Sequence, residues 1–199
     1  GQALAYGNDH LPGSRSFGEV PFGGSEPKSE AALPWDASVP VIIPDTGFHI
    51  AGYIDRLDIA DDGSRALVRD YKTGKPPSAA MVADGFALQL GILGLIAERD
   101  GFDHAKGEPG AYEYWSLGKA KDDTHPTGFG YVETPLKVGR KSSGLEPEEF
   151  LPVTSRFLRE GIAKYITGDA PFVARENPDY PAYDTYDQLM RLEEWLPRM

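Results

Sequence analysis

The sequence predicts a single α/β domain over residues 1–199. The chain has 199 residues with 40% hydrophobic content, which suits one domain with a sizeable core. Its candidate strands and helices are interleaved along the chain rather than separated into blocks. We therefore expect an irregular N-terminal arm at residues 1–46, an α/β core at 47–170 and a C-terminal tail at 171–199.

The arm is rich in Gly, Pro and Ser, which favours irregular backbone with two short strands, around Ser16–Phe22 and Val39–Ile43. A β-hairpin follows it. Alternating apolar residues predict its two strands, and a cluster of turn residues separates them. The expected ranges are Phe48–Ile59 for the first strand, Asp61–Ser64 for the turn and Ala66–Lys72 for the returning strand.

Ser78 is a suitable N-cap for a helix that runs to about Arg99. Gly85, Gly91 and Gly94 weaken this helix intrinsically, so it should need tertiary packing or allow a close backbone approach. The remaining expected elements are strands at Gly110–Leu117 and Phe129–Leu136, a helix within Pro147–Ile166 that is irregular near Pro152, and a short helix near Tyr186–Trp195.

Composition excludes several kinds of chemistry. There is no cysteine, so disulfides, thiolate zinc sites, cysteine nucleophiles and cysteine-ligated iron–sulfur clusters are excluded, and a cytoplasmic location is weakly favoured. The net charge of −11 opposes nucleic-acid binding, because non-specific affinity comes mostly from Lys and Arg. Metal-bound carboxylates, a local basic strip or basic partner domains would each resolve this conflict. The chain begins at Gly1 without an initiator Met, so we expect it to be processed or excised from a longer protein.

The hairpin brings two carboxylates together. Asp55 and Asp70 are equally distant from the turn centre between Asp62 and Gly63, so a regular hairpin places them opposite each other on one face. Their Cβ atoms would be roughly 4.5–5.5 Å apart, where like charges are destabilising. Lys72 lies two residues beyond Asp70 and points to the same face. A hard divalent cation such as magnesium would turn this repulsion into coordination.

The same spacing has a structural alternative. An Asp and a Lys two residues apart on a strand also form weak surface pairs, and Asp is common near hairpin turns for local reasons. A bulge would also shift the pairing of the two strands. Spacing alone leaves both interpretations open.

The hairpin resembles a known signature. Residues Gly52–Asp58 (GYIDRLD) and Val68–Gly74 (VRDYKTG) are similar to the GxIDRxD…DYKTG pattern of RecB-like PD-(D/E)XK nucleases. Gln89 matches the glutamine that this family carries on the following helix, while Leu93 stands where the family often has a tyrosine. The resemblance implies a restriction-endonuclease-like core, with a mixed central β-sheet flanked by helices.

The resemblance also implies roles for individual residues. Asp55 and Asp70 would ligate Mg²⁺, for which Mn²⁺ can substitute, and the backbone carbonyl of Tyr71 would be a further ligand. Lys72 would orient or deprotonate the attacking water, or stabilise charge on the scissile phosphate. Gln89 would belong to the same catalytic group.

Two further segments resemble the AddB-type members of this family. Phe17–Phe22 (FGEVPF) is similar to a strand whose glutamate, here Glu19, would help to hold metal or position water; the alternative is an exposed glutamate on the arm. Phe172–Arg175 and Tyr186–Trp195 resemble the end of the AddB nuclease domain. Some relatives hold an iron–sulfur cluster there through cysteines, and this chain, having none, is expected to lack the cluster.

Arg56 and Lys75 are candidates for contacts with DNA phosphates, with ordinary surface charge as the alternative.

The resemblance implies a Mg²⁺-dependent (exo)deoxyribonuclease that acts in a double-strand-break-repair helicase–nuclease, with DNA and helicase domains as partners. The competing hypothesis is a catalytically degenerate nuclease fold with a DNA-binding or structural role.

Overall fold

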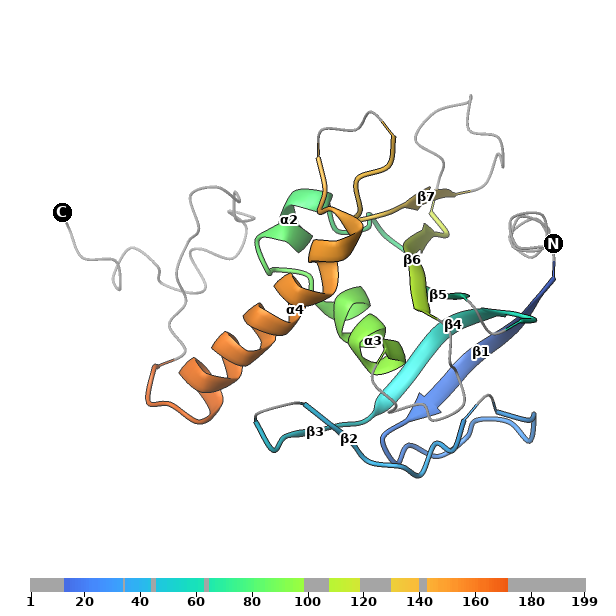
Figure 1. Ribbon diagram of the computed structural model, residues 1–199, viewed down its shortest axis with the longest axis horizontal. Coiled ribbons are helices and arrows are strands. Elements are labelled where there is room, and N and C mark those ends of the chain that lie inside the picture. Colours follow the sequence, from blue (N-terminus) through green and yellow to red (C-terminus); the bar gives the residue numbers. More distant parts are fainter. Residues whose placement is uncertain are drawn as a thin grey trace.

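The computed structural model describes residues 13–33, 35–43, 46–62, 65–98, 108–118, 130–139 and 143–171. A five-stranded sheet in the order β1-β4-β5-β6-β7 forms its centre, and a separate pair, β2 and β3, lies beside it (Figure 1). The strands are β1 (Ser14–Phe22), β2 (Val41–Ile42), β3 (His49–Ile50), β4 (Gly52–Ala60), β5 (Arg65–Lys72), β6 (Glu108–Ser116) and β7 (Tyr131–Glu133). The helices are α2 (Ala79–Ala83), α3 (Gln89–Glu98) and α4 (Pro147–Gly161), followed by a π-helical turn, η1 (Ile162–Ile166).

The central sheet is mixed. β5 and β6 are parallel, whereas the β1–β4, β4–β5 and β6–β7 pairs are antiparallel. A parallel neighbour requires a crossover connection, and α2 and α3 lie within the one that joins β5 to β6. This architecture confirms the predicted fold class, a restriction-endonuclease-like mixed sheet flanked by helices.

The arm contributes more to the sheet than the sequence predicted. β1 pairs with β4 along its length and forms an edge of the central sheet. The strand expected at Phe48–Ile59 is divided, because β3 pairs with β2 while β4 joins the central sheet after Ala51. The tail helix expected near Tyr186–Trp195 lies outside the described residues.

The helix expected from Ser78 to Arg99 is two helices. Ser78 caps α2 as predicted, since the backbone N–H of Met81 donates to its Oγ at 3.2 Å. Gly85 then adopts φ +82°, a left-handed conformation that glycine reaches without a steric penalty and that ends the helix. The chain resumes helical structure at Gln89, so the N-terminus of α3 is a second, separate helix start.

Helix α3 packs closely on its neighbours, as its glycines predicted. A Cβ atom at Gly91 would overlap the side chain of Thr154 on α4, and one at Gly94 would overlap Tyr112 on β6 and Leu151 on α4. The glycines therefore let α3 approach the sheet and α4. In Figure 1 α3 and α4 lie on the same side of the sheet.

The core lies between these helices and the sheet and extends under the arm. Its fully buried side chains include Leu57, Val68, Leu90 and Phe150. Helix α4 continues through Pro152, so the irregularity predicted there is wrong; it falls later, at η1. No helix in the described parts of the chain is long and apolar enough to cross a bilayer.

Candidate active site

The hairpin has the predicted register, and its ladder ends one position before the two aspartates. β4 and β5 pair Arg56 with Arg69, which makes Asp55 and Asp70 the next opposed positions on the other face. The Asp55 carboxylate is fixed against β5, because the backbone N–H of Tyr71 donates to Asp55 Oδ2 at 2.9 Å. The two carboxyl groups therefore lie side by side on adjacent strands.

Asp70 is a buried carboxyl group, with only 2% of its surface exposed. Burial raises its pKa above the ordinary value, and the negative charge of Asp55 adds to the rise. Lys72 opposes it, with Nζ 2.6 Å from Asp70 Oδ2. When both aspartates are ionised, their two negative charges therefore exceed the one positive charge of Lys72.

Lys72 connects the hairpin to helix α3. Its Nζ donates to Gln89 Oε1 at 2.8 Å while it pairs with Asp70. Gln89 is the first residue of α3, so the break between α2 and α3 is what places this amide at the site. The Lys72 side chain is 28% exposed and can meet a ligand from solvent. Asp55, Asp70, Lys72 and Gln89 are therefore brought together as the sequence predicted.

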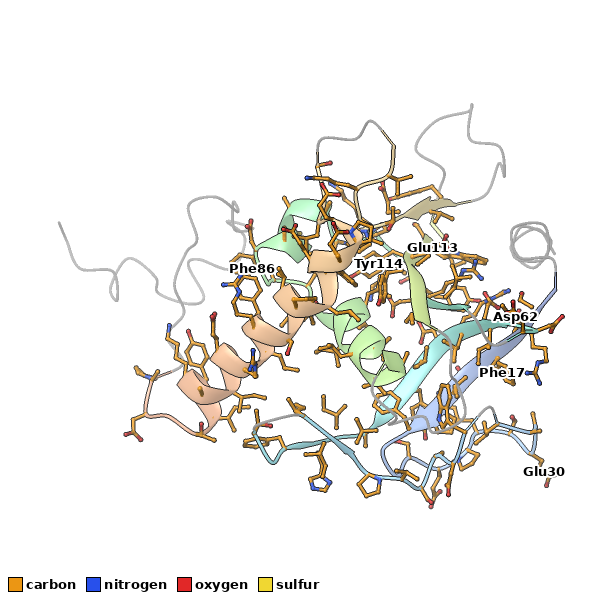
Figure 2. All side chains as sticks on the ribbon, in the orientation of Figure 1. Phe17, Glu30, Asp62, Phe86, Glu113 and Tyr114 are labelled. Atoms are coloured by element: carbon orange, nitrogen blue, oxygen red, sulfur yellow. The ribbon has the colours of Figure 1, made fainter. Side chains whose placement is uncertain are left out.

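Tyr114 is a neighbour that the sequence analysis missed. The parallel β5–β6 ladder pairs it with Asp70, and the Lys72 ammonium lies 5.8 Å from its ring centroid. Burial, and then the charge of Asp70, raise the pKa of Tyr114 above its ordinary value of 10.0. In Figure 2 Tyr114 and its chain neighbour Glu113 point to opposite sides of β6. Only the β5–β6 pairing, which is not local in sequence, reveals this contact.

Glu19 does not join the site, contrary to expectation. Its strand position is opposite Asp55, between the Gly18–Arg56 and Val20–Ile54 pairs. Its backbone is left-handed, with φ +47°, and its carboxylate pairs with Lys28 at 3.1 Å with 63% of the side chain exposed. The exposed-glutamate alternative is the correct one for this structure.

The predicted phosphate contact of Arg56 is also wrong, because its side chain is buried and already paired. Only 4% of it is exposed, and its Nε lies 3.0 Å from both carboxylate oxygens of Asp58. Its Nη2 donates to Ser16 Oγ at 3.0 Å. Strand alternation could have shown this, since Arg56 and Asp58 share the face opposite Asp55.

A second arginine completes this buried ionic network. Arg69 pairs with Asp58 and, through Nε, with Glu113 Oε2 at 2.8 Å. Trp115 Nε1 donates to the same Glu113 oxygen, also at 2.8 Å. Both guanidinium groups lie over the Trp115 ring, 5.1 Å from its centroid for Arg56 and 4.7 Å for Arg69. The network holds β4, β5 and β6 together behind the site.

The donor set fits a hard divalent cation. Two adjacent carboxylates supply anionic oxygen, and the pKa of Asp70 is raised mainly by burial and further by the negative charge of Asp55. The described parts of the chain contain no cluster of three or more His, Cys, Asp or Glu side chains arranged to hold a metal, so a metal here would have two carboxylate ligands. Magnesium is commonly bound by one or two carboxylates and completes its shell with water and substrate phosphates, so a two-aspartate site suits it.

The fold and the site share one feature: the central hairpin of a mixed sheet brings two aspartates and one lysine together. The sequence profile of the PD-(D/E)XK nuclease superfamily matches residues 15–186. The chain belongs to the PD-(D/E)XK nuclease superfamily, whose members generally use divalent metal ions. No curated protein sequence matches the chain significantly.

Replacing Asp70 with Asn should stabilise the metal-free protein at neutral pH. Because the folded-state pKa of Asp70 is raised, its ionisation costs stability, and this cost is absent below the ordinary value of 3.8 and complete above the folded pKa. The advantage of Asp70→Asn should therefore grow as pH rises from about 4. Thermal unfolding with chelator across this range measures it, with Asp61→Asn, at an exposed aspartate, as control. A variant less stable than the parent at pH 7 would show that the Lys72 pair outweighs burial.

Proposed function

We propose that the protein is a Mg²⁺-dependent (exo)deoxyribonuclease that hydrolyses phosphodiester bonds by attack of water. One observation carries this proposal: Asp55 and Asp70 lie on adjacent strands while Lys72 is held between Asp70 and Gln89. Carboxylates that repel, beside an accessible ammonium, form a site for a divalent cation and a phosphate.

Asp55 and Asp70 would hold the metal ion, with the backbone carbonyl of Tyr71 as a third protein ligand. The bound ion would supply Lewis-acid activation of water and of the phosphoryl oxygen. The hydrogen bond from the Tyr71 N–H orients the Asp55 carboxylate in advance. The same residue thus fixes one ligand through its N–H and offers another through its carbonyl.

Lys72 acts on the substrate side of the site. Its ammonium can donate to the attacking water and to the non-bridging oxygen of the scissile phosphate, where negative charge develops. Asp70 and Gln89 restrain it from two directions, at 2.6 and 2.8 Å. Gln89 is therefore a positioning residue for Lys72 in this mechanism.

DNA binding needs positive charge that the chain largely lacks, since its net charge is −11. Lys75, exposed just beyond β5, is the residue we propose to contact a DNA phosphate. The remaining affinity would come from the helicase domains of a cytoplasmic double-strand-break-repair machine. Because these 199 residues contain no cysteine, we propose that they hold no cysteine-ligated iron–sulfur cluster of the AddB type.

A cleavage assay tests the proposal. End-labelled single- and double-stranded DNA are incubated with the protein and Mg²⁺, Mn²⁺ or EDTA, and the products are resolved by length. We expect metal-dependent cleavage that Asp55→Asn abolishes and the exposed control Asp61→Asn preserves. DNA binding without cleavage under either metal would instead support the degenerate-module hypothesis.

A further inference from the structure

A cavity of about 220 Å³ opens beside the site, between the segment that follows β5 and strand β7. In Figure 1 α2 and β7 lie at the same end of the molecule. The residues that line this cavity include Lys75, Ala79, Tyr131, Glu133, Thr134 and Ser143.

The cavity is on the catalytic face of the sheet. Across β5, β6 and β7 the paired positions run from Lys72 through Ser116 to Tyr131. The adjacent row runs from Asp70 to Glu133 in the same way. Paired residues share a face, and strands are about 4.8 Å apart, so Tyr131 stands about 10 Å along the sheet from Lys72.

The wall formed by the post-β5 segment is held in place before any ligand arrives. Ser116 Oγ donates to the carbonyl of Gly74 at 3.2 Å, and the N–H of Leu117 donates to the carbonyl of Lys72 at 2.7 Å. Ser78 caps α2 one turn later. These contacts tie the cavity wall to the catalytic lysine, so the cavity keeps a fixed position relative to the site.

The lining suits an uncharged aromatic ring better than a phosphate group. Its one lysine and one glutamate, Lys75 and Glu133, cancel in charge, while Tyr131 and two prolines supply apolar surface. Hydroxyl groups and a carboxylate add hydrogen-bonding partners for ring amino groups. Aromatic side chains and mixed polar edges are how proteins hold single bases.

We propose that this cavity binds one unpaired nucleobase, next to the phosphodiester being cut, while Lys75 contacts the adjoining backbone phosphate. The inference rests on the proposed nuclease function and adds a substrate class to it. A base in a duplex must first be unpaired and unstacked to enter a cavity, which costs free energy that a single strand or a frayed end does not pay. The site therefore selects single-stranded DNA or opened ends.

Filling the cavity tests the proposal. Ala79→Phe places a ring inside it, whereas Ala80→Phe adds the same ring at the exposed next position of α2, which does not line the cavity. For each variant kcat/KM is measured on a single-stranded oligonucleotide and on bis(p-nitrophenyl) phosphate, which has no base. We expect Ala79→Phe to lower the oligonucleotide-to-diester ratio about tenfold or more. Ala80→Phe should leave it within twofold of the parent.

Ser143→Trp, on the opposite wall, repeats the test if Ala79→Phe does not fold. Binding of a fluorescent oligonucleotide by anisotropy, with Ca²⁺ in place of Mg²⁺, keeps the inference separate from catalysis. Weaker single-strand binding in the filled variants supports it even if the parent proves inactive, an outcome that would refute only the nuclease proposal. An unchanged ratio together with unchanged single-strand affinity in both filled variants overturns it.

Discussion

Lys72→Ala should lower kcat for DNA cleavage by about 10²–10⁴-fold, the range for losing a positioned proton donor or charge stabiliser. Its ammonium lies 2.6 Å from Asp70 and 2.8 Å from Gln89, and the side chain is 28% exposed. Because the carboxylates remain, metal binding should persist. The measurement is single-turnover cleavage at saturating DNA and Mg²⁺, which isolates the chemical step from association.

Lys164→Ala is the matched control for this loss of charge. Lys164 is an exposed lysine in η1, outside the proposed site. Its removal should change the single-turnover rate less than twofold. A Lys72→Ala rate within threefold of the parent would remove Lys72 from the mechanism, whatever the metal dependence.

Asp58→Ala should destabilise the fold by about 3–5 kcal/mol, the cost of breaking a buried ion pair by removing one partner. Asp58 has only 1% of its surface exposed and pairs with both Arg56 and Arg69. Without it Arg69 keeps Glu113 and the Trp115 ring, whereas Arg56 keeps the Ser16 hydroxyl and that ring but loses its carboxylate partner. For a chain of this size the melting temperature should fall by about 6–20 °C.

Urea unfolding of Asp58→Ala against Asp61→Ala makes the comparison specific. Both changes remove an aspartate at the turn end of β4, but Asp61 is exposed and its pair with Arg15 is long, at 3.9 Å. Asp61→Ala should shift the free energy of unfolding by less than about 1 kcal/mol. Equal effects of the two substitutions would mean that the network contributes nothing beyond surface charge.

The sequence predicted the hairpin well because its information is local. The predicted turn centre between Asp62 and Gly63 implies the register of the two strands, and the two-residue period of a strand implies which side chains share a face. The shared face of Asp55, Asp70 and Lys72 therefore followed from position alone, whereas their proposed roles, and Gln89, came from the resemblance. The β5–β6 pairing that brings in Tyr114 joins segments separated by a crossover, and no local pattern encodes it.

The predictions for Arg56, Glu19 and the helix after Ser78 were wrong for identifiable physical reasons. Arg56 follows Asp55 directly, so strand alternation turns it to the opposite face, where Asp58 binds it. Glu19 occupies the expected strand position, but its left-handed backbone directs its carboxylate to Lys28. The division of the α2–α3 region depends on Gly85, whose positive φ cannot be told from the helix-weakening effect of glycine in a sequence.

Calorimetric titration with Mn²⁺ tests most directly whether Asp55 and Asp70 form a metal site. The parent protein and Asp61→Asn, which carries the same loss of charge at an exposed position, should show the same saturable binding heat. Asp55→Asn should lose that heat, since only one carboxylate of the pair remains. Undiminished Mn²⁺ binding by Asp55→Asn would contradict the assignment of the metal to this hairpin.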